Sequence, residues 1–494
     1  MKLALRSRRS GRRSAVGLAV ADGWLALAAC AVVLASPVRG AALGGGKAPG
    51  ERAYRESAHG DLVRGATRAP GERRGSCLNC HGARADGTAS GTRGAKRLAA
   101  NGALGNELCF ECHQRSAATS FQGDAAYGSS GHALSPVMVW PGPPPRARAD
   151  AGKCVNCHDP HGSKDRAGLV PAMLRVRGEM LCLTCHDGDP SKDVRTAFLR
   201  QYRHPLTAEV PGGASPAAAG GRAALVPPSG ASAGIAATRT CTGCHNPHVA
   251  QPTDSSPVTA GSRPLFGVAR VRVAHGSPGT VAGYTAIPAD DGAPAREHEV
   301  CYRCHSGYAQ RPPRLVDVAA LLNPQNPSFH PVEERSRNAP IDPRAFAAGW
   351  SADRLVQCSD CHSADGDGSR GPHGSRFQHI LKRRYPVAVG GMQPVQEGDL
   401  CFECHAFATY ADPAAGQAAT YSKFPWHVAH AVDGVSCNGC HDAHGSATLP
   451  ALLVLRSPGL RSYTVGSLGT TCATTCHRKT PATVPPYRPA LHAR

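Results

Sequence analysis

Cysteine and histidine recur in this chain in one fixed pattern. Of the 21 cysteines, 20 fall into ten pairs, and a histidine directly follows each pair. Nine pairs have the spacing Cys-x-x-Cys-His, and the tenth has one extra residue between its cysteines. The hexapeptide LCFECH occurs twice, at 108–113 and 400–405. The ten motifs are Cys77, Cys80 and His81; Cys109, Cys112 and His113; Cys154, Cys157 and His158; Cys182, Cys185 and His186; Cys241, Cys244 and His245; Cys301, Cys304 and His305; Cys358, Cys361 and His362; Cys401, Cys404 and His405; Cys437, Cys440 and His441; Cys472, Cys476 and His477.

This spacing is the attachment signature of c-type haem. Cysteines three residues apart share one face of a helical turn, so both thiols can reach the two vinyl groups of one porphyrin. The histidine that follows can then bind the iron as an axial ligand. An acidic residue before each LCFECH, Glu107 or Asp399, favours a helix start there. The pattern predicts ten covalently attached haems, of which the tenth, at Cys472 and Cys476, departs from the regular spacing.

Disulfide bonds and structural zinc sites are the alternative uses for so many cysteines. Ten disulfides would suit an exported chain, but they would not require a histidine after every second cysteine. Two Cys-x-x-Cys pairs already complete a tetrahedral zinc site without the histidines. The pattern therefore favours haem.

Ten irons need ten further axial ligands. Beyond Met1 the chain has four methionines (Met138, Met173, Met180 and Met392), whereas fourteen histidines lie outside the motifs. We therefore expect bis-histidine, low-spin iron at most sites, with lower potentials than Met/His ligation would give.

The histidines outside the motifs divide the chain into five repeats of two motifs each. A histidine precedes the first motif of every repeat, and in four repeats a second histidine lies between the two motifs. The first repeat, with CHGARADG, lacks this middle histidine. We call the repeats haem-pair modules 1 to 5; they occupy residues 50–122, 123–195, 196–315, 316–412 and 413–494. Module 3 contains a Gly/Ala/Pro-rich linker at 205–240 and an insert at 249–300.

With these features, the sequence resembles the multihaem c-type cytochromes with doubled CXXCH motifs, an electron-transfer family from bacteria that respire beyond the inner membrane. The resemblance spans about residues 55–480 and rests on the upstream histidine, on CHxPHGS and on Leu-Cys-x-x-Cys-His. It implies that the upstream histidine serves the first haem of a module and the middle histidine the second. The implied upstream ligands are His59, His132, His204, His330 and His427 (or His430), for the haems at Cys77, Cys154, Cys241, Cys358 and Cys437. The implied middle ligands are His161, His248, His373 and His444, for the haems at Cys182, Cys301, Cys401 and Cys472.

This scheme leaves the haem at Cys109 and Cys112 without a local second ligand. Five histidines are candidates to fold back onto it: His275, His298, His379, His430 and His492. Otherwise its iron is open, or a partner protein supplies the ligand.

The composition predicts an irregular fold. The chain has 56 glycines and 41 prolines, only 5% aromatic residues and 18% charged residues, which is typical of loop-rich chains with weak hydrophobic periodicity. The fold class implied is an irregular multihaem cytochrome with low secondary structure, short helices that carry the motifs, and long loops wrapped around haems. Alternating residues predict a small β-hairpin insert near 262–290.

The N-terminus predicts export. Basic residues precede an apolar run at 24–35, and small residues near 41 allow cleavage, so residues 1–41 are expected to be a signal peptide. A lipid anchor at Cys30 and twin-arginine export are alternatives. We expect a protein in the periplasm, associated with the outer membrane or at the cell surface, without a transmembrane helix in the mature chain.

Charge and cofactor content together favour electron transfer. Removing residues 1–40 takes away seven basic residues and one acidic residue, which lowers the formal charge from +19 to +13. Ten ferric haems with ionised propionates would lower it further to about +3, so no nucleic-acid partner is expected. We expect an electron carrier, not an enzyme, that forms a conduit of closely spaced haems in respiratory or extracellular electron transfer. Its partners would be redox proteins such as an outer-membrane conduit or a terminal acceptor, with possible self-association. The alternatives are a reductase with one open haem at Cys109, and a subunit of a haem-stacked filament.

Overall fold

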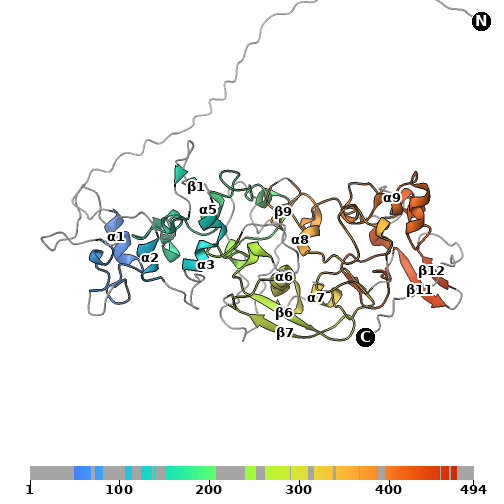
Figure 1. The fold of residues 1–494 in the computed structure, drawn as a ribbon, viewed down its shortest axis with the longest axis horizontal. Coiled ribbons are helices and arrows are strands. Elements are labelled where there is room, and N and C mark those ends of the chain that lie inside the picture. The colour runs from blue at the N-terminus through green and yellow to red at the C-terminus, as the bar shows by residue number, and fades with distance from the viewer. Residues whose placement is uncertain are drawn as a thin grey trace, which may run out of the picture. The chain divides into compact units, whose positions relative to one another are not determined.

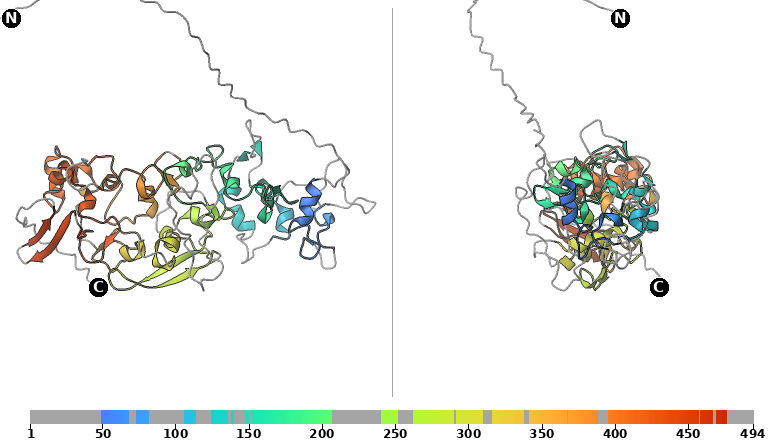
Figure 2. Two further views of the ribbon diagram at one scale, coloured as in Figure 1. Left: turned by 180° about the vertical axis from the view of Figure 1, so that it is seen from behind. Right: turned by 90° about the vertical axis from the view of Figure 1, so that its left-hand side faces the viewer.

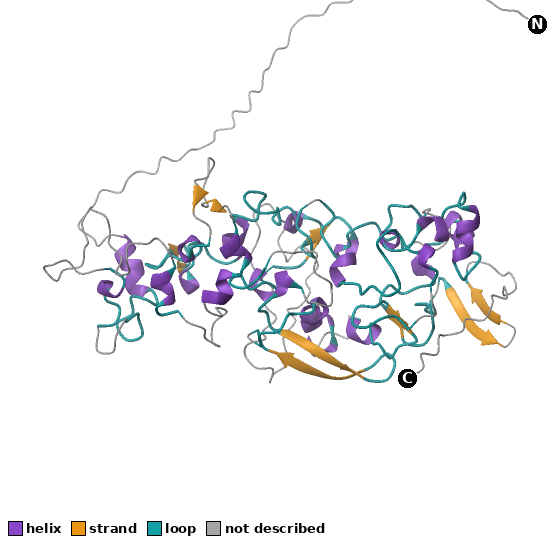
Figure 3. Ribbon diagram, in the orientation of Figure 1, coloured by secondary structure: helices purple, strands orange, loops and turns teal. Residues whose placement is uncertain are grey.

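Loops and turns connect short helices and short strands throughout the described chain (Figures 1 and 3). The computed structural model describes residues 49–67, 73–81, 106–113, 124–135, 138–139, 148–149, 152–206, 240–251, 262–289, 291–309, 316–337, 341–366, 368–387, 395–456, 458–466 and 469–475. All of them belong to one unit, Ala48–Arg494. The expected irregular, loop-rich fold is confirmed.

The longest described helix, α6, has nine residues. The α-helices are α1 (Pro49–Glu56), α2 (Glu107–Phe110), α3 (Asp124–Gly128), α4 (Gly131–Leu134), α5 (Glu179–Leu183), α6 (Glu297–His305), α7 (Val318–Leu321), α8 (Cys358–Cys361), α9 (Phe407–Tyr410) and α10 (His427–Val432). The 3₁₀ helices are η1 (Cys77–Asn79), η2 (Cys154–Asn156), η3 (Pro171–Met173), η4 (Ala197–Leu199), η6 (Cys241–Gly243), η8 (Arg263–Leu265), η9 (Gly307–Ala309), η10 (Pro343–Ala345), η11 (Gln378–Ile380), η12 (Leu400–Glu403), η13 (Gly416–Tyr421) and η14 (Cys437–Gly439).

The described strands form six two-stranded antiparallel sheets. Four pairs are neighbours in sequence, whereas β5–β9 and β8–β10 join segments far apart in the chain. The pairs are β1 (Met138–Val139) with β2 (Arg148–Ala149), β3 (Lys164–Asp165) with β4 (Gly168–Leu169), β5 (Tyr202–Arg203) with β9 (Gly374–Ser375), β6 (Arg270–His275) with β7 (Val281–Ile287), β8 (Ser328–Phe329) with β10 (Gly445–Ser446), and β11 (Leu460–Gly466) with β12 (Gly469–Thr474).

Nine of the ten cysteine motifs begin on one turn of helix, as expected. In these turns the histidine amide donates to the carbonyl of the first cysteine, for example over 2.8 Å from His113 to Cys109. The tenth motif differs because Cys472 lies on β12, where it pairs with Tyr463 of β11 (the red hairpin in Figure 2). Cys476 and His477 lie outside the described residues.

The acidic residue before the second LCFECH does more than favour a helix start. Asp399 is the residue directly before η12, but its buried carboxylate accepts hydrogen bonds from the Arg384 guanidinium at 2.6 and 2.8 Å. The amide of Gln396 donates to the same carboxylate at 2.9 Å. The Asp399 side chain therefore connects the motif to the segment that carries Arg384, and it makes no capping hydrogen bond to η12.

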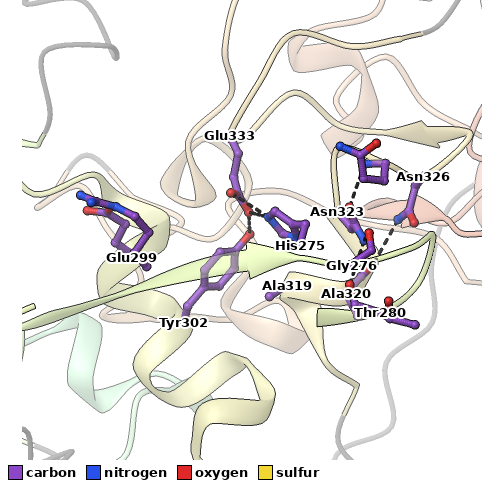
Figure 4. Close-up of polar contacts among 12 residues, drawn as sticks. His275, Gly276, Thr280, Glu299, Tyr302, Ala319, Ala320, Asn323, Asn326 and Glu333 are labelled. Atoms are coloured by element: carbon purple, nitrogen blue, oxygen red, sulfur yellow. Dashed lines mark hydrogen bonds and ion pairs between the residues drawn. The ribbon is translucent and has the colours of Figure 1, made fainter. Parts of the chain in front are cut away.

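The predicted β-hairpin near 262–290 is confirmed as β6–β7, and β6 packs on α6. Tyr302 of α6 belongs to a small core with Ala319, Leu322 and Val332. Asn323 fastens the tip of the hairpin to this core, because its side-chain amide donates to the carbonyls of Gly276, Ser277 and Thr280 at 3.3, 3.1 and 2.9 Å (Figure 4).

Replacing Asn323 with alanine is expected to lower the free energy of unfolding by about 1–3 kcal/mol, because the buried side chain and its three hydrogen bonds to the hairpin tip are lost. Denaturant unfolding of the holoprotein measures this loss. Gln325→Ala is the matched control, since Gln325 is exposed and its loss should cost less than about 0.5 kcal/mol. Equal losses in the two variants would contradict the role of Asn323.

Candidate haem-binding sites

The described part of the chain places nine motif histidines opposite a second histidine. The ring centres of each pair are 5.8–6.4 Å apart. The pairs are His81–His161, His59–His113, His158–His248, His132–His186, His245–His373, His204–His305, His362–His444, His330–His405 and His427–His441.

This separation fits a bis-histidine iron site. Two imidazole nitrogens that bind one metal each lie about 2.0 Å from it, and each ring centre lies about 1.1 Å further out, so the ring centres should be about 6 Å apart. Each pair also includes the histidine that follows two cysteines on a helical turn, or on its direct continuation. The residues present therefore fit a covalently attached haem with two histidine ligands.

Burial favours the neutral, metal-binding form of four of the paired histidines in particular. It lowers the pKa of His186 and of His405 to about 4, and nearby histidines add to the effect. For the same reasons the pKa of His373 and that of His427 fall to about 3. These imidazoles therefore offer a nitrogen lone pair at neutral pH.

The pairing of ligands differs from the one implied by the resemblance. An upstream histidine was expected opposite the first motif of its own module, but in modules 1 to 4 it lies opposite the second motif, as His132 does with His186. The middle histidine was expected opposite the second motif of its own module, but it reaches back to the first motif of the preceding module, as His248 does with His158. Only His427–His441 lies as expected.

The motif histidine left without a partner in that scheme, His113, has one in the structure. His59 lies beside His113, with the two Nε2 atoms 3.5 Å apart. None of the described candidates for folding back occupies this place. His298 instead packs on Tyr302, and His430 stacks on Phe424. His492 lies outside the described residues.

His275, another of those candidates, has a structural role. Its Nε2 lies 2.9 and 3.0 Å from the two carboxylate oxygens of Glu333, which also accepts a hydrogen bond from Tyr302 at 2.7 Å (Figure 4). Burial alone would raise the pKa of Glu333. The hydrogen bonds from His275 and Tyr302 and the nearby charge of His298 outweigh burial, so the pKa is lowered and the carboxyl stays ionised. The His275 ring therefore holds the β6–β7 hairpin.

A recurring contact between consecutive modules, here called the histidine clasp, explains the observed pairing. In each clasp the upstream histidine of one module meets the residue directly before the middle histidine of the next module. Three upstream rings place Nδ1 against that residue's carbonyl: His59 on Pro160 at 3.3 Å, His132 on Pro247 at 2.8 Å, and His330 on Ala443. His204 makes the same hydrogen bond to Pro372. The four clasps are His59 with His161, His132 with His248, His204 with His373, and His330 with His444.

Short strands reinforce two of the clasps. β5, directly before His204, pairs with β9, directly after His373, and β8 pairs with β10 in the same way at His330 and His444. Since both histidines of a clasp face the two motifs of the earlier module, each of modules 1 to 4 is completed by the one that follows it.

In modules 2, 4 and 5 the histidine of the first motif is held by a second recurring feature. A turn after the middle histidine offers a backbone carbonyl to Nδ1 of the motif histidine: Ala172 to His158 at 3.0 Å, and Ala451 to His441 at 2.7 Å. The carbonyl of His379 serves His362 in the same way at 2.8 Å. A metal-binding histidine generally donates its other N–H to such a group, which fixes the tautomer and the ring orientation.

These turns carry backbone strain. In three of them the residue that offers the carbonyl and the residue after it have positive φ, between 52° and 61°. A residue other than glycine costs free energy in the left-handed region. The turns persist because the surrounding contacts hold them. A sequence signal for these turns exists but is easily overlooked. The tripeptides Ala172–Leu174 (AML), His379–Leu381 (HIL) and Ala451–Leu453 (ALL) begin nine, four and five residues after the serine of PHGS or AHGS.

Thiol contacts link the motifs in sequence order. Cys109 forms a side-chain hydrogen bond with Cys154, and this contact lowers the pKa of Cys109 to about 7 although burial opposes it. The same contact joins the next module boundaries, at Cys182–Cys241, Cys301–Cys358 and Cys401–Cys437. Within module 2, burial and then the nearby thiols of Cys182 and Cys185 raise the pKa of Cys157 to about 11.

Two further observations concern metals and membranes. Among the described side chains, no three from His, Cys, Asp and Glu are grouped as a set that could hold a metal ion. In the described parts of the chain, no helix has both the length and the apolar character needed to cross a membrane.

Comparison with known proteins gives one match. The family model described as the doubled CXXCH motif matches residues 147–190, which cover the two motifs of module 2. No curated protein and no solved structure matches the chain. In residues 147–190 the chain is thus similar to haem-binding, electron-transferring cytochromes of the multihaem c type.

Proposed function

We propose that the chain is an exported decahaem c-type cytochrome that conducts electrons through closely spaced, mostly bis-histidine haems. The haems supply the redox chemistry, while the chain supplies attachment, ligation, spacing and burial. The observation that carries the proposal is the set of nine histidine pairs, each at the ring separation that a shared iron requires.

The thiol contacts support a path that follows the sequence. Because Cys109 touches Cys154 and Cys182 touches Cys241, the attachment points of successive modules adjoin. Haems fixed at these thiols would therefore be neighbours across each module boundary. Entry at one end of the series and exit at the other is the simplest use of such an order, in respiratory or extracellular electron transfer.

The pairing of His59 with His113 favours an electron carrier over a reductase. The reductase alternative depended on an open iron at Cys109, and a histidine at that position closes the site. The leader sequence supports export to the periplasm, the outer membrane or the cell surface, where redox proteins would be the partners.

Intact mass of the mature holoprotein, produced in a host with cytochrome c maturation, tests the proposal. The expected result is ten haem additions on a chain that begins near residue 41. Nine additions would limit haem attachment to the regular motifs. No addition would overturn the proposal and favour disulfides or zinc.

A second experiment separates the carrier from the reductase. The ferric holoprotein is expected not to bind cyanide or nitric oxide at the nine paired sites, since both axial positions are taken. Tight binding by several haems would contradict the proposed ligation.

A further inference from the structure

The paired histidine rings fall into two geometric classes that alternate along the chain. At the first motif of each module the two ring planes are nearly parallel, with angles of 6°, 13°, 27°, 8° and 29° in modules 1 to 5. At the second motif the planes are crossed, with angles of 47°, 70°, 56° and 44° in modules 1 to 4. The two sets do not overlap.

Different contacts hold the rings in the two classes. At the parallel sites in modules 2 to 5 the motif histidine is fixed through Nδ1 by a backbone carbonyl, as His245 is by Pro264 at 3.0 Å. Its partner ring is held by a nearby side chain: Asp442 lies 3.5 Å from Nδ1 of His444, and Ser369 lies 3.2 Å from Nδ1 of His373. In modules 3 and 4 both rings of the parallel pair are therefore oriented by the fold.

At the crossed sites the partner histidine is fixed by the clasp. Nδ1 of His132 meets the carbonyl of Pro247, and that of His330 meets the carbonyl of Ala443. Because this carbonyl belongs to the residue directly before the middle histidine, one clasp orients a ring of each class. The alternation therefore follows from backbone contacts that recur from module to module.

Ring orientation matters because each imidazole donates π-electron density to iron d orbitals perpendicular to its plane. Parallel rings act on the same orbital and separate it in energy from its partner, which gives a rhombic low-spin ferric spectrum. Crossed rings act on both orbitals and keep them close in energy, which gives a strongly anisotropic low-spin spectrum. The hydrogen bonds that orient the two imidazoles therefore also determine the relative energies of the iron d orbitals.

We propose that two electronically distinct classes of bis-histidine haem alternate along the chain, parallel at first motifs and crossed at second motifs. This inference rests on the proposed haem ligation. Since the thiol contacts run in sequence order, an electron passing along the series would meet the two classes in turn.

Low-temperature electron paramagnetic resonance of the fully ferric holoprotein tests the proposal. The expected spectrum contains both a rhombic and a strongly anisotropic low-spin component, in a ratio near five to four for the nine paired sites. Two matched variants from a single clasp assign them. His248→Ala should remove one rhombic spin per molecule, and His132→Ala should remove one strongly anisotropic spin.

Failure of the alternation can be told apart from failure of the proposed function. Intact mass of each variant shows whether all haems are still attached. A wild-type spectrum with one low-spin class, or loss of the same component in both variants, would overturn the alternation while leaving bis-histidine ligation in place. Should either variant fail to fold, the ratio of the two components in the wild type decides. A holoprotein without bis-histidine low-spin signals would instead overturn the proposed function.

Discussion

His444→Ala is expected to leave the haem at Cys358 and Cys361 with a single histidine ligand. The reason is the pairing of His444 with His362 across the boundary between modules 4 and 5. Iron that loses one of two strong axial ligands becomes high-spin. We therefore expect one high-spin ferric haem per molecule beyond the wild-type value, measured by electron paramagnetic resonance.

A second variant shows which haem is affected. In a chain that also carries Cys358→Ala and Cys361→Ala, the haem opposite His444 is absent, so the added His444→Ala should create no further high-spin iron. This is the logic of a double-mutant cycle. If the extra high-spin haem persists, His444 serves a different iron, and the clasp scheme is wrong at this site.

Gly445→Ala is expected to open the clasp between modules 4 and 5. A Cβ at Gly445 would lie 2.0 Å from the carbonyl oxygen of Leu321 and 3.1 Å from that of Ser328. Gly445 also pairs with Phe329 in β8–β10, so the backbone cannot move away without breaking that sheet. Overpacking of this kind typically costs about 1–3 kcal/mol.

The Gly445→Ala substitution should also weaken histidine ligation. Because β8–β10 positions both histidines of the clasp, the ligands of two haems should loosen together in this variant, and the low-spin signals of both should fall. Thermal unfolding and electron paramagnetic resonance of the holoprotein measure the two effects. Gly398→Ala is the matched control, because no atom lies within 4 Å of its added Cβ. A Gly445→Ala protein as stable as this control would contradict the role of the β8–β10 contact.

Local features of the fold could be predicted from the sequence because their causes are local. The cysteine spacing places both thiols on one helical turn, and the structure has that turn at nine motifs. The alternating residues of 270–287 predict a hairpin, which β6 and β7 form. Low aromatic content and many glycines and prolines predict short elements, as observed.

The ligand pairing could not be obtained in the same way, because it depends on contacts between modules. The resemblance implies that His161 is a ligand in its own module, whereas the fold brings it to His81 of the module before. We call this pairing between consecutive modules staggered.

Module 5 differs from modules 1 to 4 in its pairing. Its upstream histidine, His427, lies opposite the first-motif histidine His441, and its Nδ1 is hydrogen-bonded to the Ser422 hydroxyl at 2.5 Å. At this motif the structure has the pair that the resemblance implied, whereas in modules 1 to 4 the upstream histidine lies opposite the second motif.

The most direct test of the staggered ligation is an experimental structure of the holoprotein that shows which imidazole lies across each iron. We predict His248 across the iron from His158, and His132 across the iron from His186. An iron bound by His158 together with His132 would contradict the stagger and restore the pairing within modules that the resemblance implied.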